Sequence, residues 1–380
     1  MTGTTGSTAP TGADQARQLE QLPVATEYDG GDMDCGSGLL LAITSRIRAI
    51  DPGETMLLHT TEPSVLADLP AWARLAGHEL VGTTNDEGDG AWRLWVRRGE
   101  ARTAGSRAPA PEVEYSSGAP APLGTRLWLY SNFHCNLACA YCCAGSSPQA
   151  EARLMPVEMA ASAATEFAAQ GGRELLVTGG EPFLHPELGA LVAATSAEVP
   201  VTLLTNAMVF ERGRRRETLE SFDRDRVVLQ ISLDSVGPGL HDRQRGKGSH
   251  AKAMSGIRLA SELGFTVRVA ATYTPEDAGE AGDLHRALGA LGIAEEDQLI
   301  RPVAHEGFAE GGVEISLDTV EPEPTLTADG AWWHPVGVTN RHLKVADAPL
   351  PVAHVLDVMR DVVEVQQAAG DQGRTVFRCT

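Results

Sequence analysis

Residues 127–143 read LWLYSNFHCNLACAYCC, and the rest of this 380-residue chain is organised around them. A short apolar run predicts a buried β-strand, which leads directly into Cys135, Cys139 and Cys142 in a C-x3-C-x2-C array. Soft thiolates this close together on one loop suit three corners of a 4Fe–4S cube. The fourth iron would then have no protein ligand in this stretch, which leaves it open to a small molecule.

A zinc site is the alternative interpretation, with Cys143 or His134 as the fourth ligand. Structural zinc sites usually consist of two separated pairs of ligands, and the six cysteines of the chain provide no second pair. A disulfide framework is disfavoured because the first residues, MTGTTGSTAPTGADQ, do not read as a secretory signal.

Residues 173–187, RELLVTGGEPFLHPE, form a second motif, in which an apolar strand ends at Gly179-Gly180-Glu181-Pro182. Glycines at the carboxyl end of a strand let the backbone approach a ligand closely. The two motifs, in this order, resemble the radical S-adenosylmethionine (SAM) enzymes of the MoaA and PqqE type. The resemblance implies one 4Fe–4S cluster on the three cysteines and SAM as cofactors, with the SAM amino group at Gly179, Gly180, Glu181 and Pro182.

From Thr125 onward, six predicted strands alternate with helices. This alternation predicts an α/β fold with a parallel sheet and right-handed crossovers. The radical SAM resemblance makes the fold a partial (β/α)6 barrel over residues 125–304, open on one side for substrate.

Polar residues at predicted strand ends are candidates for SAM contacts. Asn206 ends one strand, and Ser232 and Asp234 follow another, where polar side chains face the mouth of a barrel. The resemblance places Tyr141 near the adenine, with ordinary loop packing as the alternative.

Two arginines are candidates for the carboxylate of SAM. Arg245 matches an arginine that the resemblance places there, and a planar guanidinium suits the task. Arg268 is a second candidate, with an ion pair as the alternative. We expect His185 to shape a turn and His241 to brace a helix rather than to transfer protons.

Residues 23–98 predict a separate two-layer α+β domain with the order β-α-β-α-β-β. This stretch resembles the TusA-type sulfur-carrier family in its Asp-Cys-Gly segment, in PGE, and in DLPAWARLAGHELVG. The resemblance implies that Cys35 is a catalytic persulfide carrier, made available as thiolate by the N-terminus of a helix. The family usually has Pro-x-Pro after the cysteine, whereas this chain has CGSG, so a docking or substrate-binding domain is the alternative.

The remaining segments flank these two domains. We expect a disordered N-terminus over residues 1–22 and a linker rich in Pro, Ala and Gly over residues 99–124. Residues 305–380 resemble a SPASM or twitch extension without an auxiliary cluster, since Cys379 is its only cysteine. Its Trp332, Trp333 and His334 are candidates to line the substrate face or simply to cover the barrel. Arg301, at the end of the last barrel strand, is a candidate for an anionic substrate group.

The bulk composition narrows the partners and the location. A formal net charge of −20 disfavours nucleic acid and anionic membranes as partners. No apolar run approaches the length of a membrane span. Clustered reduced thiols predict a cytoplasmic protein.

The sequence therefore predicts a radical SAM oxidoreductase or transferase that cleaves SAM reductively and modifies a substrate. One hypothesis adds sulfur transfer through Cys35, with a cysteine desulfurase as sulfur donor. The alternative is a peptide- or small-molecule-modifying enzyme whose N-terminal domain only docks substrate or a partner. Either requires a reductase such as flavodoxin or ferredoxin. A non-catalytic iron–sulfur or zinc protein is disfavoured by the GGEP, TNA and SLD elements.

Overall fold

The protein is described by a computed structural model that covers residues 12–34, 38–86, 90–99 and 121–368. The chain divides into an N-terminal unit, Met1–Arg107 with Glu364–Asp371, and a second unit, Ala108–Val363 with Gln372–Thr380. Each unit is described by itself. Cys35 and Cys379 lie outside the described residues, as does most of the expected linker. The domain boundaries expected from the sequence stay predictions.

The N-terminal unit is a four-stranded mixed sheet with the strand order β1-β2-β4-β3. Alternate residues of the central strands, such as Leu58 and Leu94, pack with Ile43 and Trp72 in one core, which places α2 and α3 on the same face of the sheet. This is the two-layer arrangement expected from the sequence. The elements are α1 (Gly12–Glu20), β1 (Thr26–Asp29), α2 (Leu40–Arg48), β2 (Thr55–Thr60), α3 (Val65–Leu75), β3 (Glu79–Asp86) and β4 (Ala91–Arg97).

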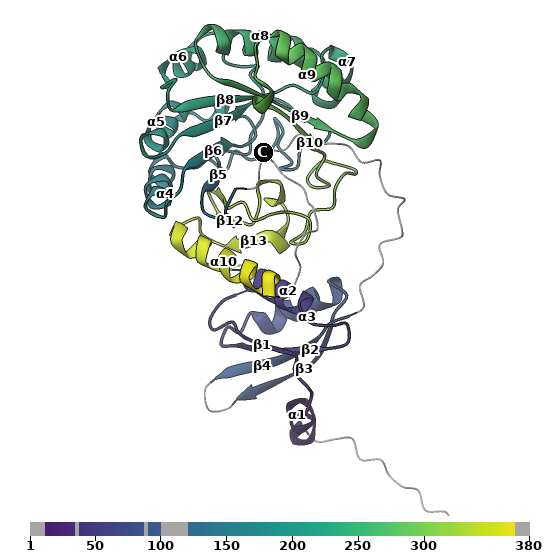
Figure 1. The fold of residues 1–380 in the computed structure, drawn as a ribbon. Coiled ribbons are helices and arrows are strands. Elements are labelled where there is room, and N and C mark those ends of the chain that lie inside the picture. Colours follow the sequence, from purple (N-terminus) through teal and green to yellow (C-terminus); the bar gives the residue numbers. More distant parts are fainter. Residues whose placement is uncertain (1–11, 35–37, 87–89, 100–120, 369–380) are drawn as a thin grey trace, which may run out of the picture. The chain divides into compact units, whose positions relative to one another are not determined.

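The second unit contains a nine-stranded sheet with the order β10-β9-β8-β7-β6-β5-β11-β12-β13. Its first six strands in the chain all pair in parallel and form an open arc (Figure 1). These are β5 (Arg126–Tyr130), β6 (Glu174–Thr178), β7 (Val201–Thr205), β8 (Val227–Ser232), β9 (Val267–Tyr273) and β10 (Gln298–Pro302). The predicted α/β fold with a partial barrel is confirmed.

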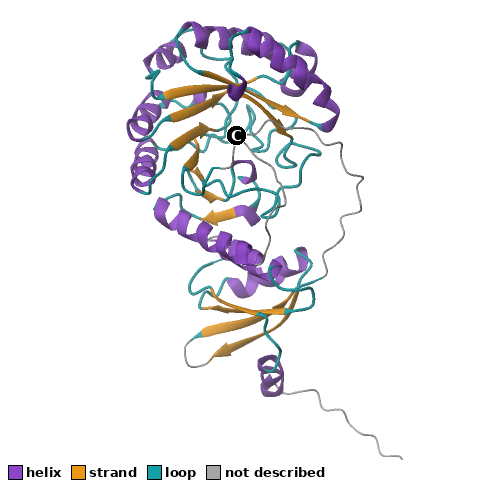
Figure 2. Cartoon of the chain, viewed as in Figure 1, coloured by secondary structure: helices purple, strands orange, loops and turns teal. Residues whose placement is uncertain are grey.

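Helices cover the outer side of this arc, as Figure 2 shows. The first of them illustrates why: α4 follows Pro156 and buries Ala160, Ala163, Ala164 and Phe167, which repeat with the period of a helix. It ends before Gly171, whose φ of 86° suits glycine. The helices are α4 (Val157–Ala169), α5 (Leu188–Glu198), α6 (Arg214–Ser221), α7 (Pro238–Arg245), α8 (Ser249–Glu262) and α9 (Ala281–Ala290).

The C-terminal segment extends the sheet beyond the barrel strands. β11 (Thr325–Thr327) pairs in parallel with β5, and β12 (Gly330–Trp332) returns antiparallel after a turn that contains Asp329. β13 (Lys344–Ala346) and α10 (Val352–Ala368) complete the segment. No helix within the described ranges has the length and apolar character needed to cross a lipid bilayer.

The strand registers divide the inner face of the barrel into layers. Tyr130 pairs with Thr178, and Thr272 pairs with Arg301, so each pair points to one face at the carboxyl end of the strands. Four residues earlier on β5 and β6, Arg126 pairs with Glu174 on the same inner face at the amino end. The two ends of one barrel interior therefore carry different side chains.

Candidate functional site

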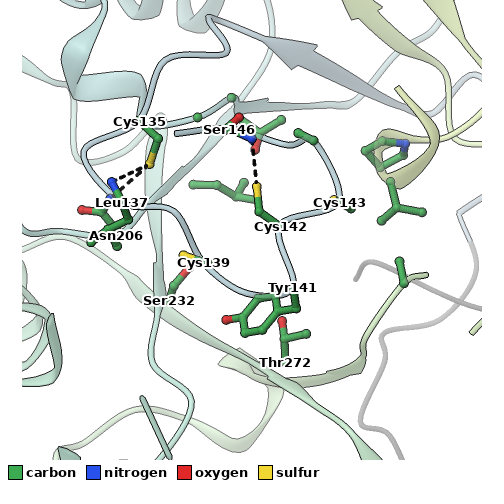
Figure 3. A pocket seen from close by; sticks show the side chains of 18 of the residues that line it. Cys135, Leu137, Cys139, Tyr141, Cys142, Cys143, Ser146, Asn206, Ser232 and Thr272 are labelled. Carbon is green, nitrogen blue, oxygen red and sulfur yellow. Dashed lines mark hydrogen bonds between the residues drawn. The ribbon is translucent and has the colours of Figure 1, made fainter. Parts of the chain in front are cut away.

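A cavity of about 190 Å³ opens at the carboxyl end of the barrel strands. Cys135, Cys139 and Cys142 line it, and Figure 3 shows their sulfur atoms facing a common space. From the predicted SAM-contact residues, the structure brings six to this cavity: Tyr141, Gly179, Gly180, Asn206, Ser232 and Arg245. The two sequence motifs and three strand ends thus meet at one place.

The cysteine loop is fastened to the barrel by backbone hydrogen bonds. The Ser131 amide donates to the carbonyl of Thr178 at 2.8 Å, which joins the ends of β5 and β6. The Cys135 amide donates to the carbonyl of Ser147 at 3.2 Å, and the Ala140 amide donates to the carbonyl of Gln244 at 2.9 Å. These bonds fix the loop from both sides, so the thiols are held in place by the fold.

Polar hydrogens surround the cysteine sulfurs. The Leu137 amide lies 3.4 Å from Cys135 Sγ, and the Ser146 amide lies 3.4 Å from Cys142 Sγ (Figure 3). Burial raises the pKa of the Cys135 thiol to about 12 and that of the Cys139 thiol to about 11. Iron ligation deprotonates a thiol and compensates for this desolvation, while N–H groups at the sulfurs stabilise the thiolates. The donor set therefore fits an iron–sulfur cluster.

The spacing of the thiols also bears on the kind of metal centre. Among the residues that the structure describes, no three His, Cys, Asp or Glu side chains gather closely enough to hold a single metal ion. A cubane does not require such a gathering, because each of the three thiolates binds a different iron.

Gly179 and Gly180 bring the end of β6 against the cysteine loop. The Gly180 amide donates to the carbonyl of Asn132 at 3.0 Å. A Cβ atom on Gly180 would lie 2.2 Å from the carbonyl oxygen of His134, and one on Gly179 would lie 2.6 Å from that of Asn132. Glycine is therefore required by the approach of one motif to the other, as well as by the cavity that both line.

Glu181 and Pro182 do not line the cavity, and their predicted contact with SAM stays a prediction. The Glu181 carboxylate is fully buried and accepts hydrogen bonds from the Asn206 amide at 2.8 Å, the Thr205 hydroxyl at 2.8 Å and the Phe183 amide at 3.1 Å. Its pKa is raised by burial. Pro182 begins a 3-10 turn (Pro182–Leu184) and is buried. Both residues connect the ends of β6 and β7.

Asp234 also lies behind the cavity wall, where it holds two side chains that form the wall. Its carboxylate accepts from Arg245 Nε at 2.6 Å, from the Tyr141 hydroxyl at 2.8 Å and from the Thr272 amide at 3.1 Å. The Asp234 amide donates to Nδ1 of His241 at 3.1 Å, so His241 connects α7 to the loop that follows β8. We call Asp234, Arg245, Tyr141, Thr272 and His241 the cavity-end network.

Arg268, the second arginine predicted to bind SAM, lies away from the cavity. It lies near the amino end of β9, four residues before Thr272 on the same inner face, and does not line the cavity. Arg268 Nε donates to Asp297 at 3.0 Å and its Nη1 to Glu174 at 3.3 Å. The ion pair, which was the alternative interpretation, is what the structure contains. We call Arg126, Glu174, Thr202, Arg268 and Asp297 the amino-end network.

The tryptophans of the C-terminal segment pack beneath the cavity rather than lining it. The Trp332 indole donates to the Thr327 hydroxyl at 3.1 Å, and the Trp333 indole donates to the carbonyl of Val320 at 3.3 Å. His334 is buried beside them, and burial lowers its pKa to about 3. The next residues along the chain, Pro335 and Val336, are the ones that reach the cavity.

Several cavity residues were not among the predicted SAM contacts. Thr272, Cys143 and Ser146 line the cavity, as does Arg301. Strand alternation would have found Thr272, because Arg268, Ala270 and Thr272 share one face and only Thr272 is at the carboxyl end. His185 shapes the turn after the GGEP segment as expected, since its Nε2 lies 3.0 Å from the carbonyl oxygen of Met155 and its Nδ1 accepts from the Glu187 amide.

Known proteins resemble this part of the chain. The profile of the Radical SAM superfamily matches residues 130–282. Residues 130–282 are a radical SAM domain. The domain has the cofactors of this superfamily of enzymes, a 4Fe–4S cluster and SAM, and the thiols and glycines described above fit them.

The curated relatives extend the likeness only over part of their length. The chain is 31% identical to the antilisterial bacteriocin subtilosin biosynthesis protein AlbA of Bacillus subtilis, over 50% of this chain and 42% of AlbA. It is 32% identical to the GTP 3',8-cyclase of Microcystis aeruginosa, over 34% of this chain and 42% of the cyclase. The chain thus spans less than half the length of these relatives.

A solved structure supports the fold. The protein anSMEcpe with bound AdoMet is similar with a TM-score of 0.50 at 12% identity, over 64% of this chain and 83% of that chain. At this identity the likeness concerns the fold alone.

Proposed function

We propose that this protein reductively cleaves SAM and uses the resulting radical to abstract a hydrogen atom from a substrate in the barrel. The observation that carries the proposal is the single cavity shared by Cys135, Cys139, Cys142 and the polar ends of β7 and β8. When bound, the reduced cluster supplies one electron that splits SAM into methionine and a 5′-deoxyadenosyl radical.

The chain's own residues bind and orient SAM in this proposal. Gly179 and Gly180 leave room for the amino group, and Arg245 offers its guanidinium to the carboxylate. Asn206 and Ser232 present polar atoms to the ribose, and Tyr141 borders the adenine. Asp234 is a positioning residue, because it reaches the cavity only through Arg245 and Tyr141.

For the substrate we infer a peptide, with a small molecule as the second candidate. AlbA, by its name, is a biosynthesis protein of a bacteriocin, and this likeness covers more of the chain than the likeness to a GTP cyclase. The composition supports a cytoplasmic enzyme that obtains its electron from a reductase such as flavodoxin or ferredoxin.

The N-terminal unit enters the proposal through its sequence. Its TusA-like features support either sulfur carriage by Cys35, supplied by a cysteine desulfurase, or docking of the substrate. A Cys35→Ser variant separates the two. Unchanged turnover with the true substrate would exclude sulfur carriage, whereas loss of a sulfur-bearing product with SAM cleavage retained would support it.

The enzyme class is tested with Cys139→Ala, and Cys143→Ala is the matched control. Both are reconstituted anaerobically with iron and sulfide, reduced with dithionite and given SAM. We expect Cys139→Ala to lose the cluster and all 5′-deoxyadenosine, because a cubane cannot be held by two thiolates, while Cys143→Ala keeps its iron. Iron and sulfide analysis with mass spectrometry of 5′-deoxyadenosine measures both. Undiminished 5′-deoxyadenosine from Cys139→Ala would refute the proposal.

A further inference from the structure

A second cavity, of about 520 Å³, lies beside the GGEP segment and shares no lining residue with the cavity of the cysteines. Its walls come from the 3-10 turn after β6, the start of α5, and the loop that leads into α6. Its lining includes three arginines together with Leu184 and Pro186, which reach the solvent, whereas Phe183 and Leu188 in the same lining are buried. We call this cavity, lined by Phe183–Leu188 except Glu187 and by Arg212–Arg215 with Thr218, the basic hollow.

The charge of the basic hollow is not balanced by its own walls. No carboxylate lines it, although the chain as a whole carries a formal net charge of −20. Arg212 and Arg214 are exposed, and neither forms an ion pair or a side-chain hydrogen bond with any residue that the structure describes. Arg212 and Arg214, two residues apart in the chain, carry like charges that repel one another, so the arrangement favours an anionic partner from outside.

Two features give the basic hollow a defined shape. Arg215 Nε donates to the carbonyl of Phe183 at 2.9 Å, which ties the α6 loop to the turn after β6. The N-cap residue of α6 is Gly213. Because glycine has no side chain, no side chain caps the first amides of the helix. The positive end of the helix therefore adds to the charge of the arginines.

The basic hollow and the cavity lined by the three cysteines, here called the cluster cavity, are connected through shared hydrogen-bond partners. Phe183 lines the hollow, and its amide donates to the Glu181 carboxylate at 3.1 Å. The same carboxylate accepts from the Asn206 amide, and Asn206 lines the cluster cavity with its Nδ2 4.0 Å from Cys135 Sγ. Only two residues, Glu181 and Pro182, separate Gly180 in one wall from Phe183 in the other, so their Cα atoms are at most about 11 Å apart.

We propose that the basic hollow docks an acidic one-electron carrier protein of the flavodoxin or ferredoxin kind. This inference rests on the proposed function, which requires an electron at the cluster. In the docked complex one electron leaves the carrier, which is oxidised, and enters the cluster, which is reduced. No covalent bond forms or breaks. The carrier approaches the cluster from behind Cys135, so SAM and substrate keep the open side of the barrel.

The composition of the basic hollow favours a protein over a small anion. A site for a small anion usually surrounds it with buried donors, whereas these arginines are exposed and stand beside the aliphatic side chains of Leu184 and Pro186. Arginine is enriched at protein interfaces. Electron-transfer complexes are small and transient, and they depend on electrostatic steering between opposite charges.

The test is Arg214→Glu, with Arg286→Glu as the matched control. Arg214 is the first residue of α6, where a glutamate is favourable for the helix, so the variant should fold. Arg286 is an exposed arginine on α9, outside the basic hollow. Cluster-loaded full-length proteins are mixed with flavodoxin kept reduced by NADPH and its reductase, and the bleaching of cluster absorbance is followed by stopped flow. Dithionite replaces flavodoxin in a parallel series.

We expect Arg214→Glu to slow cluster reduction by flavodoxin about tenfold, and to flatten its dependence on ionic strength, because steering is lost. Reduction by dithionite should not change, and Arg286→Glu should behave as the parent protein. Because bleaching needs neither SAM nor substrate, a failure of SAM cleavage would leave this result standing. Equal slowing with dithionite, or no slowing with flavodoxin, would overturn the inference. Inhibition by inorganic phosphate beyond that of chloride at matched ionic strength would also overturn it, in favour of a small-anion site.

Discussion

The two ends of the barrel interior use the same residue types for different purposes. At the carboxyl end, Arg245 is held by Asp234 and keeps a face toward the cavity. At the amino end, Arg268 is held by Asp297 and Glu174 and closes the barrel. Both arginines satisfy carboxylates inside one barrel. Which end of the barrel an arginine faces therefore separates the proposed ligand-binding role of Arg245 from the structural role of Arg268.

The two networks also differ in their connections. In the amino-end network Glu174 accepts hydrogen bonds from Arg126, Arg268 and the Thr202 hydroxyl, so that side chains from β5, β6, β7 and β9 meet inside the barrel. In the cavity-end network one carboxylate, that of Asp234, serves an arginine, a tyrosine and a strand amide. Removing a partner should therefore damage stability at the amino end and the binding of SAM at the carboxyl end.

The largest effect is expected from Asp234→Asn, with Asp297→Asn as the same change in the other network. An asparagine presents an amide N–H to donors that previously met a carboxylate, so Arg245 and Tyr141 lose their alignment. Charged hydrogen bonds of this kind contribute about 1.5–3 kcal/mol, which corresponds to an increase of about 10- to 100-fold in the KM for SAM. Steady-state 5′-deoxyadenosine formation measures this, and the KM in Asp297→Asn should stay near that of the parent protein. A parental KM in Asp234→Asn with cluster content retained would contradict its positioning role.

A smaller effect of the opposite kind is expected from Arg268→Met. Its side chain is 33% exposed, so solvent screens the ion pairs with Glu174 and Asp297, and we expect a loss of about 1–2 kcal/mol in the free energy of unfolding. The KM for SAM should not change. Arg245→Met is the matched variant and should raise that KM. Urea unfolding and steady-state kinetics are measured on the same preparations. An Arg268→Met protein of parental stability with a raised KM would return Arg268 to the binding site.

The sequence was sufficient for the architecture because each strand is a short apolar run with a glycine or polar residue at its end. The loop between Cys135 and Cys142 and the glycines at 179 and 180 could be placed at one edge for the same reason, since the carboxyl ends of parallel strands meet there. The structure brings Tyr141, Asn206 and Ser232 to the same cavity.

What the sequence could not supply was the direction of individual carboxylates and the depth of individual arginines. Glu181 follows two cavity-lining glycines, yet its side chain turns away to satisfy the amides of Phe183 and Asn206. Asp234 lies two residues beyond Ser232, the last residue of β8, so the alternation of the strand does not determine where its side chain points. The position of Arg268 was accessible in principle, because it precedes Thr272 by four residues on one face. Its ion-pair partners come from β6, which is not a neighbour of β9 in the sheet, and from the 3-10 turn before β10, and motif matching considers neither.

The smallest expected effect is a pH dependence of the free energy of unfolding, which should arise in the cavity-end network and not in the amino-end network. Burial, with the nearby Arg245, lowers the pKa of His241 to about 4, whereas an unfolded histidine has a pKa of about 6.5. The unfolded state therefore binds a proton more readily than the folded state between these values. The stability that neutral His241 provides is complete above pH 6.5 and is lost as the pH falls toward 4. Asp234, Asp242 and His250 also face the ring, and none of them belongs to the amino-end network.

We expect the parent protein to lose about 1 kcal/mol of unfolding free energy through His241 between pH 7.5 and pH 5.5. In His241→Asn this loss should disappear, because an asparagine oxygen accepts the Asp234 amide without titrating. Arg268→Met should keep the parental pH dependence even though it is less stable at both pH values. Anaerobic urea titrations of the three cluster-loaded proteins at the two pH values measure these differences. An equal pH dependence in His241→Asn and the parent protein would show that acid sensitivity is not located at the cavity end, and the division between the two ends would then rest on binding alone.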